Sequence, residues 1–388
     1  MGPPFWELLR GYHWRVEEYA GSKVKPRPAV VLAAAVGFAL AAISSAQFVL
    51  FPVADPTRQQ LRGICAGPDG NIWFTVGNRV GRMTPSGALT EFELPNTGSQ
   101  PGDIVAGPDG NLWFLEENAL AVGRISPAGA ITEYPIPAAN PGLITIAVGP
   151  DGAIWFSDFL RHSIWRMTLS GKFTEYPASG ASTSGLSVGS DGNLWFTTIF
   201  GSPKSIGRMT SSGGITLFPR PPSNSFGLGC ALGPDGNIWY GVGDRLFGRI
   251  TPSGAITEFP LAGDRGHGVI AVATGFDGNL WMPVDESWAC IPSPCTPPPD
   301  RDAILRVSVS GLQTRFELGE EFRIGDAAKI TAGPAGSMWF TALSGVVRFF
   351  PAQLAGAAPP SGIPTVGDVA RVVSVGLLAL AGFALLRR

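Results

Sequence analysis

The segment Gly67-Pro68-Asp69-Gly70-Asn71-Ile72-Trp73-Phe74 is the main evidence for the fold, because variants of it occur seven times along the chain. Every copy has a Gly-x-x-Gly turn followed by a short apolar segment with a tryptophan. The tryptophans are Trp73, Trp113, Trp155, Trp195, Trp239, Trp281 and Trp339. Their spacing is close to 40 residues until the last interval, which is longer. Such self-similarity is typical of one supersecondary unit used many times.

Each repeat predicts four strands. In the first copy these are residues 63–66, 71–75, 81–84 and 89–94, separated by Asp-Gly and Pro-Ser-Gly turns. Asp-Gly readily adopts the positive φ angles of a tight hairpin, and the last segment alternates as a half-buried strand does. Seven four-stranded antiparallel units predict an all-β chain folded as a seven-bladed β-propeller.

The two ends of the repeat region predict how the ring closes. The seventh copy stops after its third strand, near residue 351, whereas residues 47–53 resemble an isolated fourth strand such as 256–260. Pairing these segments completes blade seven and leaves no open sheet edge. We therefore expect the propeller to cover residues 47–352.

The N-terminal segment, residues 1–46, carries Lys23, Lys25 and Arg27 before an apolar run at 29–43 and small residues up to Ala46. A positive flank, an apolar core and a small-residue end are the marks of a secretory signal. Cleavage after Ala46 and retention as an uncleaved membrane anchor are the two alternatives. Both place the propeller outside the cytoplasm.

The C-terminal segment mirrors this arrangement. A Pro/Gly/Ala-rich linker at 353–365 precedes an apolar stretch within 366–388 that ends in Arg387 and Arg388. This tail resembles the sorting signals of Gram-negative exosortase-type systems, and a plain tail anchor is the alternative. The resemblance implies a membrane contact, a processing protease, and a location in the periplasm, outer membrane or cell surface of a Gram-negative bacterium.

The charge balance and the cysteine spacing argue against two classes of function, nucleic-acid binding and zinc binding. With 28 Lys plus Arg against 30 Asp plus Glu and no basic cluster, the chain lacks the charge pattern for nucleic-acid binding. We also expect the protein to be a monomer. An insertion at 285–302 holds Cys290 and Cys295, which an oxidising compartment would allow to close a small loop. Cys65 and Cys230 fit as small core residues. No Cys or His spacing matches a zinc site.

Function is expected in residues that break the repeat. The third strand of every copy has an arginine, and seven copies of it predict a structural role, either stacking on the tryptophan or pairing with a turn aspartate. The variable loops instead supply candidate ligand-binding residues at one face: Glu116, Asp158, His162 and Glu286. A solvated rim is the alternative. The expected ligand is a small molecule, a peptide or a protein.

The repeated phrase Gly-Pro-Asp-Gly-Asn-Ile-Trp-Phe-Thr, together with residues 248–260, resembles the streptogramin B lyases, also called virginiamycin B lyases. The resemblance runs over 47–352. It implies a Mg²⁺-dependent elimination that opens a cyclic depsipeptide at its ester. It also implies a histidine opening blade six, a Glu-x-His opening blade seven, and a glutamate after the last tryptophan.

Matched residue by residue, the implied site is incomplete. His267 opens blade six and is the candidate catalytic residue, while Asp326 stands for the first glutamate. Ala328 stands where the base belongs, and alanine cannot accept a proton. Ala342 and Leu343 occupy the place of the last glutamate. In a second alignment, Asp285 supplies the carboxylate that accompanies His267. Arg265 would then stand in place of the metal-binding glutamate, and its positive charge would repel magnesium.

Three functions therefore remain open at this stage. The first is an exported ligand- or protein-binding propeller without the family's lyase activity and with no certain cofactor. The second is a carbon–oxygen lyase using His267 with Mg²⁺, for which Asp285 and Asp326 are the candidate metal ligands and Glu286 lies nearby. The third is a hydrolytic lactonase, which would need a carboxylate-lined metal site in the channel.

Overall fold

A computed structural model of the chain describes residues 48–53, 61–139, 141–178, 180–199, 203–221, 227–243, 245–261, 268–285, 302–325 and 328–351. All of these residues belong to the compact unit that begins at residue 47. They form β-strands joined by turns, with short 3-10 helices η3 (Glu320–Phe322) and η4 (Pro334–Gly336). The described fold is all-β, as predicted.

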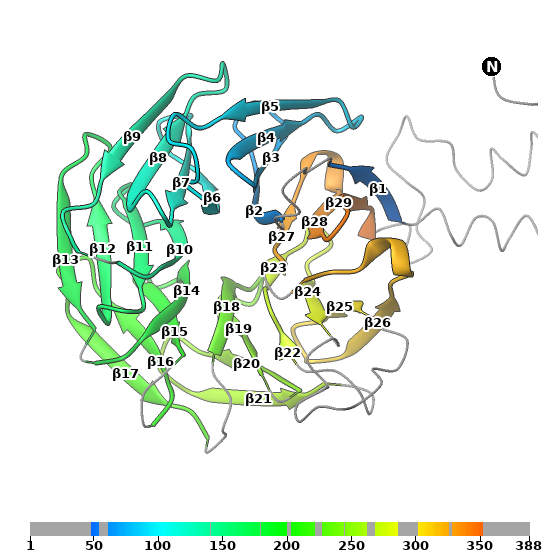
Figure 1. Ribbon diagram of the computed structural model, residues 1–388. Coiled ribbons are helices and arrows are strands. Elements are labelled where there is room, and N and C mark those ends of the chain that lie inside the picture. The colour runs from blue at the N-terminus through cyan, green and yellow to red at the C-terminus, as the bar shows by residue number, and fades with distance from the viewer. Residues whose placement is uncertain are drawn as a thin grey trace, which may run out of the picture. The chain divides into compact units, whose positions relative to one another are not determined.

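Seven antiparallel sheets surround a central axis as the blades of a propeller, each with its first strand innermost (Figure 1). Blades one to three are β2 (Leu61–Ala66), β3 (Ile72–Val76), β4 (Arg79–Met83) and β5 (Leu89–Glu93); β6 (Pro101–Ala106), β7 (Leu112–Glu116), β8 (Ala121–Ile125) and β9 (Ile131–Pro135); and β10 (Leu143–Val148), β11 (Ile154–Asp158), β12 (Ser163–Met167) and β13 (Phe173–Pro177). Blades four and five are β14 (Thr183–Val188), β15 (Leu194–Thr198), β16 (Ser205–Met209) and β17 (Ile215–Pro219); and β18 (Gly227–Leu232), β19 (Ile238–Val242), β20 (Leu246–Ile250) and β21 (Ile256–Pro260). Blade six is β22 (Gly268–Val269), β23 (Ala273–Thr274), β24 (Leu280–Asp285), β25 (Ala303–Val307) and β26 (Gln313–Glu317), and blade seven is β27 (Ile330–Ala332), β28 (Met338–Ala342), β29 (Gly345–Phe349) and β1 (Phe48–Pro52).

The repeated tryptophan is the core of every blade. Each one is almost fully buried and stacks on an aromatic ring of the outermost strand, with centroids 5.5 to 5.8 Å apart. Stacked pairs contribute about 0.5–1.5 kcal/mol beyond the apolar area they bury. In the first six blades the indole N–H donates to the aspartate of the preceding turn, as Trp73 does to Asp69 at 3.0 Å. One motif thus supplies both the hairpin and the packing.

The repeated arginine has the structural role that its repetition predicts, and both expected forms occur. In five blades the guanidinium lies over the tryptophan ring, 5.4 to 5.8 Å from its centroid. In blades three and six it pairs with the turn aspartate, through Arg166–Asp151 and Arg306–Asp277, and in blades four and five it makes both contacts. The arginine joins the third strand of each blade to its first hairpin.

The N-terminal strand completes blade seven, which confirms the predicted closure. β1 pairs antiparallel with β29 from Phe48 opposite Phe349 to Pro52 opposite Gly345. Its Phe51 stacks on Trp339 with centroids 5.5 Å apart, in the place that an outer-strand aromatic takes in the other six blades. The first and last parts of the propeller are therefore joined within one sheet (Figure 1).

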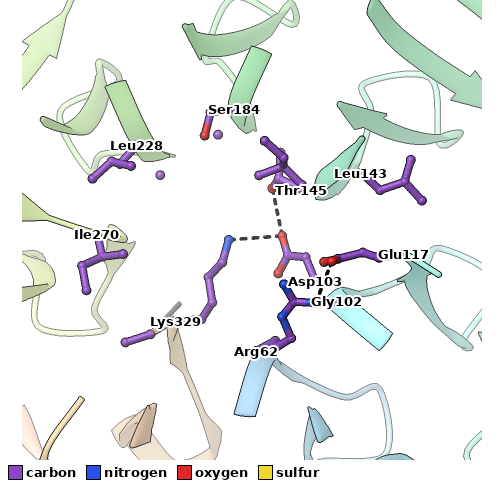
Figure 2. Close-up of a pocket in the computed structure, with 14 residues that line it drawn as sticks. Arg62, Gly102, Asp103, Glu117, Leu143, Thr145, Ser184, Leu228, Ile270 and Lys329 are labelled. Atoms are coloured by element: carbon purple, nitrogen blue, oxygen red, sulfur yellow. Dashed lines mark hydrogen bonds and ion pairs between the residues drawn. The ribbon is translucent and has the colours of Figure 1, made fainter. Parts of the chain in front are cut away.

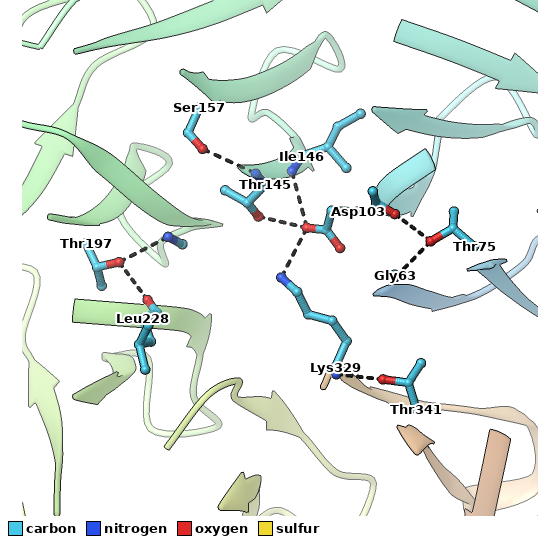
Figure 3. A network of polar contacts seen from close by, with 12 residues as sticks. Gly63, Thr75, Asp103, Thr145, Ile146, Ser157, Thr197, Leu228, Lys329 and Thr341 are labelled. Atoms are coloured by element: carbon cyan, nitrogen blue, oxygen red, sulfur yellow. Dashed lines mark hydrogen bonds and ion pairs between the residues drawn. The ribbon is translucent and has the colours of Figure 1, made fainter. Parts of the chain in front are cut away.

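Bulges in the inner strands release residues from strand pairing at the centre of the ring. In blades one to five the register between the first and second strands breaks, for example between Leu61 and Ile64. A second-strand hydroxyl repairs the break in blade one: Thr75 Oγ1 accepts from Gly63 N at 2.9 Å and donates to the Gly102 carbonyl of blade two at 2.6 Å (Figure 3). The residues between the register positions leave the ladder at the axis.

The membrane and cysteine predictions fall mostly beyond these residues. Within the described part of the chain, no helix has the length and apolarity needed to cross a bilayer. The expected signal or anchor, the linker, the tail, Cys290 and Cys295 lie outside the described residues. Cys65 and Cys230 are free thiols packed between blades. Burial raises the pKa of both, that of Cys230 to about 12, so neither is a reactive thiolate at neutral pH.

Candidate functional site: the central pocket

A pocket of about 250 Å³ lies where the bulged inner strands meet. Every blade contributes to its wall, mostly through residues that the bulges release from the ladder. Figure 2 shows Arg62, Asp103, Glu117 and Lys329 grouped together, Leu143 on the same side as Glu117, and Leu228 and Ile270 across the pocket from it. The polar side chains are Arg62, Asp103, Glu117, Thr145, Ser184 and Lys329, and the larger apolar ones are Leu143, Ile144, Leu228 and Ile270.

The Asp103 carboxylate is the centre of the polar side. One oxygen, Oδ2, accepts from Thr145 Oγ1 at 2.8 Å and Ile146 N at 3.3 Å, and it lies 3.3 Å from Lys329 Nζ (Figure 3). Lys329 belongs to blade seven and Asp103 to blade two. The ion pair therefore connects two blades that are separated in the ring by blade one. The Lys329 amide donates to Thr341 Oγ1 at 3.0 Å, which fixes the backbone that carries the lysine against β28 of its own blade.

A second ion pair lies beside the first. Arg62 NH1 lies 2.7 Å from Glu117 Oε2, with both side chains only partly exposed. Burial raises the pKa of Glu117, Arg62 opposes that rise, and the negative charge of Asp103 adds to it. The polar side therefore holds two cations and two carboxylates, already paired with one another.

The side chains predicted from the loops lie elsewhere. Glu116, Asp158 and His162 do not line the central pocket. Asp158 is buried and accepts from Gly142 N at 2.8 Å, and the exposed His162 shares a 2.8 Å hydrogen bond between Nδ1 and Ser182 Oγ. Their roles as ligand residues stay predictions.

Four other candidates cannot be placed in the pocket. His267, Glu286 and Asp326 lie outside the described residues. Asp285 ends β24 opposite Gly268, and its side chain also lies outside the described part. Their predicted catalytic, ligand-binding and metal-binding roles therefore stay predictions.

Sequence reasoning missed Arg62, Asp103 and Lys329. It sought polar groups in the loops, whereas these three stand in or beside the first strand of their blades. These residues could have been found as charged residues at the start of the strand that the repeat places innermost in each blade. The bulges that turn Arg62 and Asp103 toward the axis were not visible in the sequence.

The described pocket does not fit a magnesium ion. Its two carboxylates already face Lys329 and Arg62, and a divalent cation between them would meet two positive charges. Among the residues that the structure describes, no three His, Cys, Asp or Glu side chains gather as metal ligands. Ala328, at the position where the resemblance implies the base, lines the pocket wall.

Comparison with known proteins agrees with this architecture. The sequence profile of the Virginiamycin B lyase family matches residues 46–289, more than half of the chain. The chain belongs to the virginiamycin B lyase family. Among curated relatives, the virginiamycin B lyase of Bordetella parapertussis is 46% identical over 56 residues, which are 14% of this chain and 18% of that protein. The aligned part is thus less than a fifth of that relative's length.

Solved structures of the family are similar over the whole propeller. A streptogramin B lyase structure is 27% identical with a TM-score of 0.67, covering 78% of this chain and 96% of its own. A catalytically inactive His-to-Ala variant of the Staphylococcus aureus virginiamycin B lyase, solved with quinupristin, is 28% identical with a TM-score of 0.65, covering 78% and 99%. In that relative, a histidine-to-alanine replacement accompanies loss of catalysis.

Proposed function

We propose that this virginiamycin B lyase family member is an exported, surface-associated binding module that holds a small zwitterionic ligand, or the end of a peptide, without the family's elimination reaction. The observation that carries the proposal is the paired charge of the central pocket next to Ala328. The terminal apolar runs support export and membrane attachment.

The charge arrangement favours a zwitterion over a simple ion. A lone anion would face Asp103 and Glu117, and a lone cation would face Arg62 and Lys329. A zwitterion can place its carboxylate against one of these cations and its ammonium group against one of these carboxylates, so the net charge of the pocket does not change. The apolar side chains of Leu228 and Ile270, from the neighbouring blades five and six, suit an aliphatic side chain.

Pocket size supports the same ligand class. A volume of about 250 Å³ is just below the usual 300–1,000 Å³ range of ligand sites. A small amino acid derivative or a dipeptide end is of suitable size, whereas a whole cyclic depsipeptide would have to remain largely outside.

Loss of the elimination is proposed because Ala328 has no proton-accepting atom. General-base catalysis requires a basic group within hydrogen-bond reach of the proton it removes. The neighbouring Lys329 is held by Asp103 at 3.3 Å and is positively charged in that pair. It has no lone pair to accept a proton.

Activity is tested with the full chain, Mg²⁺ and quinupristin, following the cyclic substrate by chromatography. We expect no conversion. The alternative function, a carbon–oxygen lyase, predicts Mg²⁺-dependent ring opening that is lost in His267→Ala, and this result would overturn the proposal.

Binding is tested by calorimetry with glycyl-leucine as the zwitterionic probe. We expect millimolar or tighter binding that Lys329→Met weakens at least about tenfold, while Lys172→Met, an exposed turn residue of blade three, leaves it unchanged. No binding at millimolar concentration, or equal binding of the uncharged N-acetylated amide, would contradict the proposed ligand class.

A further inference from the structure

Blade six carries large apolar side chains where the first blade has proline or alanine. Phe276, in the turn before β24, is 68% exposed, and Leu312, in the turn before β26, is 73% exposed. Val309 in the same second turn is 38% exposed. The first blade has Pro68, Pro85 and Ala88 at these three positions.

These side chains share one face of the propeller. Leu280 pairs with Val307, so both turns lie at the same end of blade six. They are about two strand spacings apart, on the order of 10 Å. Leu232 of blade five, 36% exposed, joins them because Thr274 Oγ1 donates to its carbonyl at 2.5 Å. We call Leu232, Phe276, Val309 and Leu312 the blade-six patch.

The described chain begins and ends beside this patch. Phe48 of β1 pairs with Phe349 of β29, and Phe349 also pairs with Met338, so both described chain ends lie at the end of blade seven that carries the turn before β28. Phe349 packs on Trp281 of blade six with centroids 5.0 Å apart. Trp281 in turn donates to Asp277, the neighbour of Phe276, at 3.1 Å.

The sequence beyond these two ends is apolar on both sides. Residues 29–43 precede the propeller and residues 372–386 follow it. Twenty residues, 352–371, separate the described C-terminal end from the second apolar run in the sequence. If either apolar run enters a bilayer, the face with the blade-six patch is the one held close to it.

We propose that the blade-six patch docks on a lipid bilayer surface, with the opposite face of the propeller turned to solvent. The inference rests on the membrane attachment in the proposed function for its tether, and on the patch itself for the orientation. Tethering raises the effective concentration of the patch at the surface to the millimolar range, so a few apolar side chains suffice. The neighbouring Asp277 is neutralised by Arg306 at 2.9 Å and does not repel anionic headgroups.

The test is oxidative footprinting of the full chain in vesicles of phosphatidylethanolamine and phosphatidylglycerol at 3:1, compared with the lipid-free protein in amphipol. We expect oxidation of Phe276 and Leu312 to fall at least about fivefold in vesicles. Leu160 and Leu343, exposed in the loops at the other end of their blades, serve as internal controls and should be oxidised equally in both states.

Two variants separate docking from attachment. F276P/V309P/L312A replaces three residues of the patch by those that blade one has at the same positions. This variant should still sediment with vesicles, but its Leu232 should be oxidised to the same extent as in amphipol. L160S/L343S should keep the protection. Sedimentation of the wild type without protection would overturn docking and leave attachment standing. Absence of sedimentation would overturn both docking and attachment. Equal protection of the patch in vesicles and in amphipol would mean that protein rather than lipid covers it, and would overturn docking.

Discussion

At the scale of single residues, blade two differs from its neighbours in one buried charge. Glutamates at one position of the outer strand pair with arginine in three blades, as Arg79–Glu91, Arg161–Glu175 and Arg220–Glu258 at 2.8 to 3.0 Å. In blade two Glu133 faces Glu116 and accepts from Asn96 Nδ2 at 2.9 Å. Glu116 is fully buried, and neither of its carboxyl oxygens has a well-placed donor among the described residues.

Glu116 should make the stability depend on pH. Burial raises its pKa to about 7, with repulsion from Glu133 adding to a rise that Ser99 opposes. The folded state therefore binds an extra proton between about pH 4.5 and 7, and stability falls as pH rises through that window. We expect Glu116→Gln to raise the free energy of unfolding by on the order of 1–2 kcal/mol at pH 8, after allowance for solvent screening.

The measurement is urea unfolding of both proteins at pH 5 and pH 8. The gain should be much smaller at pH 5, where Glu116 is mostly protonated in the folded protein. Glu93→Gln, at a 76% exposed side chain, is the matched control and should show no such difference. A gain of equal size at both pH values would contradict a titrating Glu116.

At the scale of elements, second-strand hydroxyls join one blade to the next. Thr197 Oγ1 accepts from Gly185 N at 3.0 Å and donates to Leu228 O of blade five at 2.6 Å. Thr75 makes the equivalent contacts in blade one. Because the same bulges expose the pocket-lining residues, these hydroxyls stabilise the blade contact and the site together.

Replacement of this hydroxyl tests the contact. Thr197→Val keeps the shape but leaves the Gly185 amide and the Leu228 carbonyl without their partner. We expect a loss of about 1–3 kcal/mol in the free energy of unfolding, measured by urea titration. Thr216→Val, on an exposed position of β17, should change it by less than about 0.5 kcal/mol. Equal losses in both variants would contradict the role of the bulge contact.

At the scale of the whole molecule, stability depends on a strand that begins the propeller and completes its last blade. Without β1, β29 would expose its edge and Trp339 would lose its stacking partner Phe51. An open ring also removes the only sheet in which the two ends of the propeller meet, among the sheets that the structure describes.

Removal of residues 47–54 should therefore abolish cooperative thermal unfolding, as followed by circular dichroism. The milder Phe51→Ala should retain the fold and cost about 2–4 kcal/mol through lost aromatic packing. Val49→Ala, at a 36% exposed position of the same strand, is the control and should cost much less. An unchanged melting temperature after the deletion would contradict closure by β1.

The propeller, its seven blades and its closure could be predicted from the sequence, because they follow from local turn chemistry, strand alternation and repetition. The family resemblance, aligned on the repeat, also placed Ala328 at the position of the base. Which charges meet depends instead on the folded chain. Arg62, Asp103 and Lys329 are far apart along the chain. They come together because the bulges of blades one and two release Arg62 and Asp103 at the axis, where Lys329 lies at the start of blade seven. Glu116 and Asp158, predicted as loop residues, are the last residues of β7 and β11, and their burial depends on neighbouring strands that no local pattern specifies.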